Sequence, residues 1–390
     1  MVTRRMFLGG LAATATSGAL IGSGTVSAAS GPVAPAAARV PNSLPFTVVN
    51  DSGRYPNSAL WMHLVGRELP SDRPVRMTPD GTLAYVSASD NDADGFADYA
   101  IPLNGAGDTR FDLPINFSGR AYFSVTEKIR FRVNPDDTLA YPAGWVESDP
   151  NYRILHDCME FTYDATGMYC NTTKVDMFSM PLGIELTGSE TQRTGFLVDG
   201  GREAVFAAMR GNPDFANLVV DDLRVIAPSH GIDSGLFSPT FYDSYVDAVW
   251  NRYQSDTLTV TANHTDFTGQ VQGGLFTFTG GVSPFEKPTT RDVLFCDGAL
   301  HAPNDGISGP VAAVLGASLN RSTLLDSARA PILDPDAFYL DQTSNHYSRV
   351  LHENMVDGKV YGFAFDDVGD FASYVQDHAP AGITVSINPF

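Results

Sequence analysis

The stretch HDCMEFTYDATGMYCNTTKVDMFSMPLGIEL, residues 156–186, places acidic side chains among residues that are typical of buried β-strands. Within MEFTYD, apolar and polar side chains alternate. Because successive residues of a strand point to opposite faces, this pattern predicts a half-buried strand. Its buried face would carry Met159, Phe161 and Tyr163, and its outer face Glu160, Thr162 and Asp164.

The segment TTKVDMF also alternates, which predicts a second strand. Its two faces would carry Thr173, Val175 and Met177 on one side and Thr172, Lys174 and Asp176 on the other. If the two strands form a hairpin around Met168, Glu160 lies opposite Asp176 on the polar face. A bulge would change this register.

Two carboxyl groups that face each other repel when both are ionised, so a strand pair gains no stability from them. Cleavage of a glycosidic bond, in contrast, requires one carboxyl that protonates the leaving oxygen and one that activates water or attacks the sugar. Glu160 and Asp176 are therefore a candidate acid–base pair. The alternative is a solvated acidic strand face without a catalytic role.

The chain as a whole has the composition of a folded, mainly β protein. Of its 390 residues, 43% are hydrophobic and 18% are charged, and 25 prolines and 36 glycines separate many β-branched and aromatic runs. This composition favours short strands joined by turns. The length exceeds that of a usual single core, so we expect two domains or one domain with a large insertion.

The net charge of −20 argues against partners that are bound through phosphate groups. An acidic surface repels nucleic acids and anionic lipids. We therefore expect a neutral ligand, no nucleic acid, no membrane partner for the mature form, and a monomer.

The N-terminal segment has the pattern of an export signal. Arg4 and Arg5 precede a mildly apolar stretch, and a small-residue site, VSA, ends at Ala28. This pattern indicates a twin-arginine signal peptide over residues 1–28, followed by a Pro/Ala-rich linker over residues 29–45. No later run reaches the ~20 apolar residues of a membrane span. We expect a secreted, soluble, extracellular protein.

The three cysteines, Cys158, Cys170 and Cys296, are too few for a disulfide framework and wrongly spaced for zinc. Cys158 and Cys170 could form one bridge, or they could be two buried thiols.

Signatures of other enzyme classes do not occur in the sequence, which contains no G-x-S-x-G, H-E-x-x-H or phosphate-loop motif. DNDADG, residues 90–95, resembles the start of a calcium loop, but Ile101 stands where a bidentate glutamate is required. We interpret it as an acidic turn. We interpret His230 as a structural histidine. The sequence predicts neither a cofactor nor a metal site.

Further elements follow from local patterns. Strands are expected in residues 46–53, 58–68, 82–88, 97–103, 119–133, 257–264, 274–281, 358–368 and 381–387. Helices are expected in residues 201–211, 238–254 and 309–325. Ser238 would cap the second helix, with Pro239 in its first turn.

Several separated stretches resemble known families. FTVVNDSG…LWMHLVG, MEFTYD…TTKVDMFSMPLGI and GKVYGFAFDDV…ITVSINP are similar to strands of thaumatin-like proteins, although the disulfides of those proteins are missing and a long helical middle is added. DYAIPL, SGRAYFSV, DPNY, FYDSYVDAVWNRY, VLFCDGAL and LNRSTLL complete a resemblance to the bacterial, laminaripentaose-producing β-1,3-glucanases of glycoside hydrolase family 64. It covers about residues 45–390.

The resemblance implies a mainly β fold with an α/β part: a thaumatin-like β-barrel or sandwich, a mixed α/β subdomain, and a wide groove between them. Because both ends of the chain match the barrel, we expect the barrel in residues 46–190 and 289–390, with residues 191–288 inserted as the subdomain. A simple barrel followed by a C-terminal domain is the alternative.

The resemblance also implies hydrolysis of β-1,3-glucan, such as laminarin or curdlan, with inversion and release of short oligosaccharides. Glu160 in EFTY would be the general acid and Asp176 in VDMF the general base. The sugar groove would be lined by Thr162, Asp164, Tyr169 and Thr173. Asp164 stands where the family pattern suggests an amide, and Tyr169 where a larger aromatic is common, so the subsite contacts of these two residues should differ.

Two other functions fit parts of this pattern. A non-catalytic thaumatin-like glucan-binding protein would share the fold and the ligand and would differ only in turnover. An exported structural or adhesive protein would bind no glucan. The presence of both Glu160 and Asp176 favours the enzyme, and residue chemistry leaves β-1,4 and β-1,6 linkages open.

Overall fold

The computed structural model describes residues 40–390 of the chain. The expected signal peptide and nearly all of the linker lie outside the described residues.

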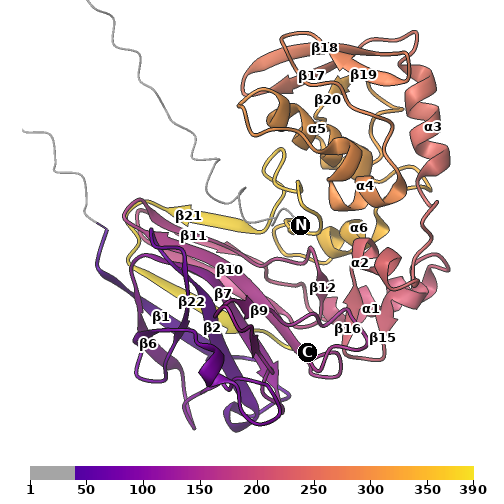
Figure 1. The fold of residues 1–390 in the computed structure, drawn as a ribbon. Coiled ribbons are helices and arrows are strands. Elements are labelled where there is room, and N and C mark those ends of the chain that lie inside the picture. Colours follow the sequence, from indigo (N-terminus) through magenta and orange to yellow (C-terminus); the bar gives the residue numbers. More distant parts are fainter. Residues whose placement is uncertain (1–39) are drawn as a thin grey trace, which may run out of the picture. The chain divides into compact units, whose positions relative to one another are not determined.

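Two β-sheets form the first part of the fold (Figure 1). The five-stranded sheet consists of β14 (Thr191–Thr194), β13 (Leu182–Thr187), β22 (Gly382–Ile387), β1 (Ser43–Asn50) and β6 (Thr109–Pro114), in that order. The eight-stranded sheet has the order β21 (Tyr374–Asp377), β11 (Gly167–Asn171), β10 (His156–Asp164), β7 (Phe117–Val125), β2 (Leu60–Glu68), β3 (Arg73–Met77) and β4 (Leu83–Tyr85), and β5 (Ile101–Pro102) pairs with β2.

Both sheets are open, because neither strand order returns to its first strand. The expected β-barrel is therefore corrected to two open sheets, whereas the mainly β character with few helices is confirmed. Side chains from the two sheets share one hydrophobic core, which includes Phe46 and Val385 from the smaller sheet and Phe123 and Phe161 from the larger one. Open sheets expose their edges and one face of each strand, and such a face can carry a site.

The end of the chain completes the smaller sheet. β22 pairs in parallel with β1 and antiparallel with β13. Figure 1 shows this strand, in yellow, beside the indigo β1. In β22, Ile383, Val385 and Ile387 are buried and alternate with partly exposed residues, which is the pattern of a strand with one face on the core.

A second hydrophobic core is formed by residues between Phe178 and Val360. Its helices are α1 (Gly201–Gly211), α2 (Pro228–Asp233), α3 (Asp243–Arg252), α4 (Thr290–Phe295), α5 (Ser308–Asn320) and α6 (His346–Glu353). Its strands form one sheet of β12 (Met177–Phe178), β16 (Arg224–Ile226) and β15 (Val219–Val220), and another of β19 (Leu275–Phe278), β18 (Thr265–Gln272), β17 (Leu258–Ala262) and β20 (Arg329–Ala330).

The remaining elements are short. A two-stranded sheet pairs β8 (Arg132–Val133) with β9 (Leu139–Ala140). Single 3-10 turns are η2 (Asn57–Ala59), η3 (Ala88–Asp90), η4 (Ala216–Leu218), η5 (Gly298–Leu300) and η6 (Pro335–Ala337). In the acidic turn at residues 90–95, Asp90 completes a capping box with Ser87 and accepts a hydrogen bond from Tyr99 at 2.7 Å.

Most of the expected elements are present, with three corrections. The helix expected over residues 238–254 begins only at Asp243, and Ser238 accepts a hydrogen bond from Thr240 N in the preceding turn instead of capping it. The segment 358–368 is not a strand: it is irregular up to residue 363, apart from a bridge at Tyr361, and continues as turns. Elements that were not expected include the strands β3, β6 and β18 and the helices α2, α4 and α6.

The domain limits expected from the sequence remain a prediction. β21 and β22 do pair with strands from the first half of the chain. The helices α4, α5 and α6 contribute to the second hydrophobic core.

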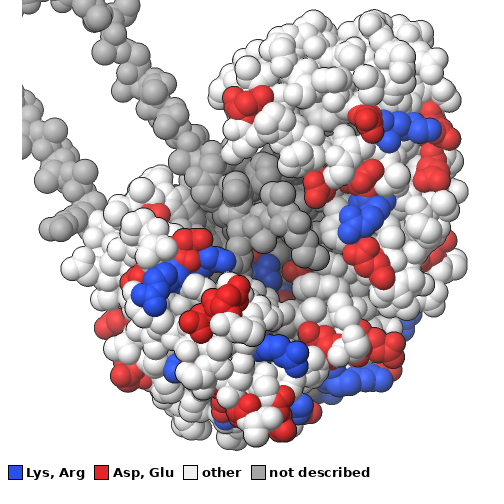
Figure 2. Space-filling model, viewed as in Figure 1, with Lys and Arg blue, Asp and Glu red and all other residues white. Residues whose placement is uncertain are grey.

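Cys158 and Cys170 are buried thiols that do not form the bridge left open by the sequence, and Cys296 is also buried. No helix within residues 40–390 is long and apolar enough to cross a membrane. The face drawn in Figure 2 carries acidic and basic side chains side by side, so the negative net charge does not form one continuous patch on that face.

Candidate active site

The candidate active site starts from two neighbouring strands, β10 and β7. Glu160 of β10 and Arg120 of β7 are paired directly in antiparallel register. Because paired residues project from the same face of a sheet, their side chains meet. The alternation expected for β10 is confirmed, since Met159, Phe161 and Tyr163 are buried and the residues between them are partly exposed.

Arg120 lies between the two predicted catalytic carboxylates. Its Nη2 and Nε donate to Glu160 Oε1 at 2.7 and 3.0 Å, and its Nη1 is 3.7 Å from Asp176 Oδ2. The exposed fractions of the Arg120, Glu160 and Asp176 side chains are 23%, 19% and 15%. A guanidinium group remains charged in proteins, so a permanent cation separates two carboxylates that a ligand can still reach.

The path of the chain from Glu160 to Asp176 differs from the expected hairpin. β10 and β11 do form a hairpin, but its turn is at residues 165–166 and Glu160 pairs with Asn171. After Asn171 the chain leaves the sheet, and residues 172–176 contain only an isolated bridge. The expected register of Glu160 opposite Asp176 is therefore wrong, although the two carboxylates do meet at Arg120.

A buried ion pair holds the segment 172–176 in place. The two faces expected for TTKVDMF are wrong, because Thr172, Thr173 and Lys174 are all buried. Lys174 Nζ is 2.9 Å from Asp157 Oδ2, and both side chains are almost completely buried. The same Asp157 oxygen accepts hydrogen bonds from the backbone of Ser179 and Met180, which anchors the chain on both sides of Asp176.

Two backbone contacts of Lys174 complete this anchor. The carbonyl of Lys174 accepts a hydrogen bond from the Tyr347 hydroxyl at 2.7 Å, and its N–H donates to the carbonyl of Tyr361 at 2.8 Å. Residues from the second core and from the C-terminal quarter of the chain thus fix the segment that carries Asp176.

His230 contacts Asp176 from the short helix α2. Its Nε2 is 2.8 Å from Asp176 Oδ1, and the imidazole stacks on the indole of Trp145 with ring centres 4.3 Å apart. The interpretation of His230 as a purely structural histidine is therefore incomplete. A lone histidine in a loop-and-helix segment carries no local pattern that reveals a partner 54 positions away.

Glu160 has two further neighbours that the sequence did not indicate. Asn171 Nδ2 lies 3.4 Å from Glu160 Oε2. The pKa of the Tyr361 hydroxyl is raised well above its usual range by burial and then by the charges of Asp367, Glu160 and Asp366. Tyr361 therefore remains a neutral hydroxyl beside the carboxylates, and it donates to the carbonyl of Ala364 at 3.1 Å.

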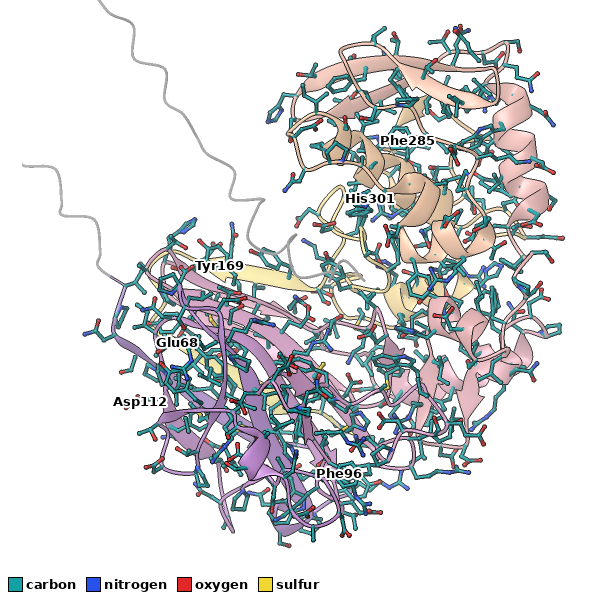
Figure 3. The ribbon with its side chains drawn as sticks, in the orientation of Figure 1. Glu68, Phe96, Asp112, Tyr169, Phe285 and His301 are labelled. Carbon is teal, nitrogen blue, oxygen red and sulfur yellow. The ribbon has the colours of Figure 1, made fainter. Side chains whose placement is uncertain are left out.

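Three of the four expected sugar-binding residues lie on the face that carries Glu160. Thr162 hydrogen-bonds Ser118 at 2.7 Å and pairs with Tyr169 across β10 and β11. Tyr169, labelled in Figure 3, is partly exposed on β11. Asp164 Oδ1 accepts from the backbone N–H of Thr166 at 2.7 Å, so this carboxylate shapes the hairpin turn.

The fourth, Thr173, belongs to the anchored segment and not to the exposed face. It retains 6% of its exposure and forms an isolated bridge with Tyr361. The structure thus brings Thr162 and Tyr169 together with Glu160, whereas Thr173 lies among the residues that hold Asp176.

A pocket of about 580 Å³ adjoins the His230 side of the site. It is lined by Trp145, Val146, Glu147, Ser148, His230, Asp233 and Ser234. His230 therefore lies between Asp176 and this opening.

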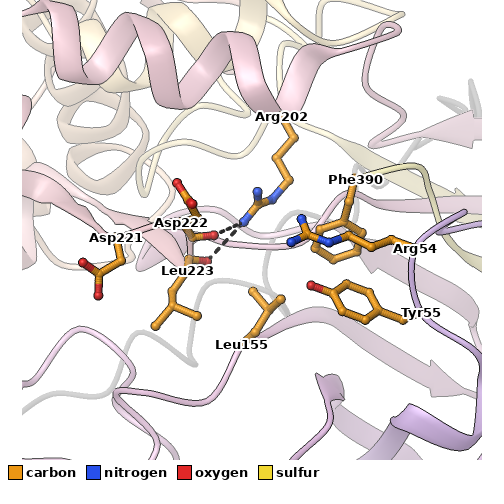
Figure 4. A pocket seen from close by; sticks show the side chains of 8 residues that line it. All are labelled: Arg54, Tyr55, Leu155, Arg202, Asp221, Asp222, Leu223 and Phe390. Carbon is orange, nitrogen blue, oxygen red and sulfur yellow. Dashed lines mark hydrogen bonds between the residues drawn. The ribbon is translucent and has the colours of Figure 1, made fainter.

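A second cavity, of about 360 Å³, contains neither carboxylate (Figure 4). In its wall, Arg202 donates to the carbonyls of Asp222 and Leu223 and to that of Ser179. Through these bonds, Arg202 joins the chain segment at Ser179 to the segment at Asp222 and Leu223.

Within residues 40–390, no group of three or more histidine, cysteine, aspartate or glutamate side chains could hold a metal ion.

Comparison with known sequences places the chain among characterised relatives. A family model described as β-1,3-glucanase matches residues 42–387. A glucan endo-1,3-β-glucosidase of Cellulosimicrobium cellulans is 35% identical over 412 aligned positions, which cover 97% of this chain and 69% of the relative. A glucan endo-1,3-β-glucosidase of an Arthrobacter strain is 34% identical over the same shares of the two chains.

Solved structures give the same result for the fold. A laminaripentaose-producing β-1,3-glucanase in complex with laminaritetraose superposes with a TM-score of 0.83 and 36% identity, and the match covers 90% of this chain and 99% of that one. A β-1,3-glucanase domain from Clostridium beijerinckii superposes with a TM-score of 0.78 and 26% identity, over 90% and 98% of the two chains.

Proposed function

This chain belongs to glycoside hydrolase family 64, the β-1,3-glucanases, and we propose that it hydrolyses β-1,3-glucan with inversion, using Glu160 as general acid and Asp176 as general base. The observation that carries these roles is the pair of carboxylates joined by Arg120. We further propose that the products are short oligosaccharides, by analogy with the laminaripentaose-producing relative.

The geometry supports two separate roles for the carboxyls. Inverting glycosidases hold them roughly 6.5 to 9.5 Å apart, so that water fits between the base and the sugar. Here one guanidinium contacts both groups, at 2.7 and 3.7 Å. Contact with different nitrogens of one guanidinium holds the two carboxyls near each other without direct contact being needed.

The contacts of Glu160 indicate which oxygen would donate the proton. Two guanidinium N–H groups occupy Oε1. Oε2 accepts a longer hydrogen bond, of 3.4 Å, from the Asn171 amide. We therefore assign Oε2 as the atom that carries the proton to the glycosidic oxygen.

Asp176 is held in a complementary way. Its Oδ1 is engaged by His230 at 2.8 Å, and its Oδ2 forms an ion pair with Arg120 at 3.7 Å. We assign Oδ2, the oxygen on the side of Arg120, as the atom that receives the water proton. In the reaction, the water oxygen bonds to the anomeric carbon, its proton passes to Asp176, and the bond to the leaving oxygen breaks as Glu160 protonates that oxygen.

The strand face beside Glu160 supports a role in holding the polymer. Thr162 and Tyr169 share this face, and a tyrosine offers an apolar ring with a polar hydroxyl. A relative with 36% identity was solved with laminaritetraose. We propose that the chain binds a β-1,3-linked glucan along this face, as a monomer and without a cofactor, nucleic acid or membrane partner.

The test is hydrolysis of laminarin or curdlan, followed by reducing-end release and by NMR of the fresh products. We expect α-anomeric oligosaccharides, because inversion at a β-linkage gives the α-anomer. The variants Glu160→Gln and Asp176→Asn should each lower kcat by at least about 10²-fold, the usual contribution of general acid–base groups.

Matched variants remote from the site serve as controls. Glu185→Gln and Asp112→Asn lie on the other sheet, and Figure 3 labels Asp112 on its strand. Both should retain wild-type turnover. Glucan binding without new reducing ends would identify a non-catalytic binding protein, and β-anomeric products would refute inversion.

We also propose export through the twin-arginine signal, on the sequence pattern of residues 1–28 alone. Replacing Arg4 and Arg5 by lysine in the producing cell should remove activity from the culture medium while activity persists inside the cells. Unchanged secretion of this variant would show that another signal acts.

A further inference from the structure

We infer that His230 is the positioning residue of the reaction, which orients Asp176 so that one carboxylate oxygen faces the attacking water. This inference rests on the proposed function, in which Asp176 is the general base. His230 itself does not touch the reacting atoms in this assignment.

The contact joins the segment before β12 to the short helix α2, and both adjoin the second hydrophobic core. His230 and Asp176 are 12% and 15% exposed, and Nε2 and Oδ1 are 2.8 Å apart. The N–H of Ala227, which precedes α2, also donates to the carbonyl of Asp176 at 3.1 Å. One short helical segment therefore fixes both the backbone and the carboxylate of the same residue.

Aromatic rings hold the imidazole in the orientation that this contact needs. Trp145 stacks on it at 4.3 Å with an interplanar angle of 21°. Phe295 packs against it edge-on, with ring centres 5.5 Å apart and an angle of 89°. Trp145 and Phe295 thus form an aromatic cage around His230. Arg291 lies 4.2 Å from the Phe295 ring centre and also pairs with Asp233 of α2, which links Phe295 to the helix that carries His230.

The chemical consequence concerns the two oxygens of Asp176. A carboxylate that rotates about its χ2 bond presents either oxygen to the water and spends part of its time misaligned. The Nε2–H of His230 binds Oδ1, and the cage prevents the ring from following such a rotation. Oδ2 is thereby kept on the side of Arg120, where the proposed base must receive its proton.

The experiment compares three variants of His230 in steady-state hydrolysis of laminarin. His230→Ala and His230→Asn should lower kcat by about 10²-fold, the loss expected for a misplaced catalytic group, with KM changed less than about twofold. His230→Gln, whose side-chain N–H reaches about as far as Nε2, should recover at least tenfold of that loss. The melting temperature of each variant shows whether it is folded.

Histidine controls and catalytic variants separate the possible results. His301 is 60% exposed (Figure 3), and His301→Ala and His301→Gln should behave as wild type. Wild-type kcat in His230→Ala together with an inactive Asp176→Asn would overturn the positioning role and leave the proposed function intact. An active Asp176→Asn would overturn the proposed function itself.

Two further outcomes also count against the inference. If KM rises and kcat is unchanged, His230 is a substrate contact. If the glutamine variant is as slow as the asparagine variant while both are folded, the N–H donor at the Nε2 position is not what Asp176 requires. Should the alanine variant fail to fold, the comparison between the two amides still decides the question.

Discussion

At the scale of single residues, the site depends on one arginine that serves two carboxylates. The paired strands β7 and β10 align Arg120 with Glu160, and the planar fork of the guanidinium allows a further contact with Asp176. Lysine carries the same charge but cannot make the bidentate contact. The arrangement of Glu160 and Asp176, the proposed acid and base, thus depends on the shape of this side chain and not only on its charge.

We therefore predict that Arg120→Lys lowers kcat by about 10²-fold through misplacement of Glu160. The measurement is laminarin hydrolysis by the folded variant, with circular dichroism as a check on the fold. Arg110→Lys is a matched control, because Arg110 is exposed and pairs only with Asp108 two residues away. Full activity in Arg120→Lys would show that a positive charge alone is sufficient.

The alternation of β10 could be read from the sequence because it is a local property of one strand with one buried face. The prediction that Glu160 lies on the partly exposed face of this strand is confirmed for this reason. The environment of Asp176 could not be read in the same way, since Lys174 and Asp157 are both charged and yet buried together. A buried charge is tolerated only when its partner is present, and a partner that lies 17 positions earlier leaves no periodic signal.

At the scale of elements, the segment 172–176 works as a braced loop between β11 and β12. Its buried Lys174–Asp157 pair ties the loop to β10. We predict that Lys174→Met destabilises the protein by about 3–5 kcal/mol, the usual cost of leaving one partner of a buried pair without the other. Activity should fall as well, because the loop carries Asp176.

Urea unfolding followed by tryptophan fluorescence measures this loss. Arg193→Met is the matched control: Arg193 is 61% exposed and pairs with Glu185 at 3.4 Å, so its removal should cost less than about 1 kcal/mol. Equal effects of the two variants would mean that the buried pair does not brace the loop.

The element expected at residues 358–368 shows why an apolar run can mislead. The side chain of Asp366 is fully buried, where it accepts hydrogen bonds from Arg321, from Ser348 and from the N–H of Gly362. These contacts bend the chain into turns. For β18 the error was the opposite one, because a strand was present where none was expected. Its sequence TDFTGQVQ is mostly polar, and its buried positions are Phe267, Gly269 and Val271.

At the scale of the whole molecule, two buried histidines set a limit on acid stability. Burial lowers the pKa of His63 and of His156 to about 3, so both are neutral in the folded protein at any pH above that value. The unfolded chain, with ordinary values near 6.5, binds these protons first. The stability that these two neutral histidines contribute is therefore fully present above pH 6.5 and is lost as the pH falls from 6.5 towards 3.

We predict that lowering the pH from 7 to 5 decreases the free energy of unfolding by about 2 kcal/mol for each of these histidines. Asp367, whose pKa burial raises to about 6, acts in the opposite direction, because its protonated form is favoured by folding. The measurement is urea unfolding at both pH values for wild type and for His63→Leu, which should lose about half of the histidine contribution. An unchanged pH dependence in this variant would contradict the assignment.

The position of β22 has a consequence for when the protein can fold during its synthesis. This strand, residues 382–387, lies between β1 and β13 and bonds to both. A growing chain therefore lacks the strand that joins β1 to β13 until residue 387 has been made. Pairings this distant in sequence form late and slowly, so we expect the nascent chain to expose the apolar sides of β1 and β13 and to depend on protection from aggregation until β22 emerges.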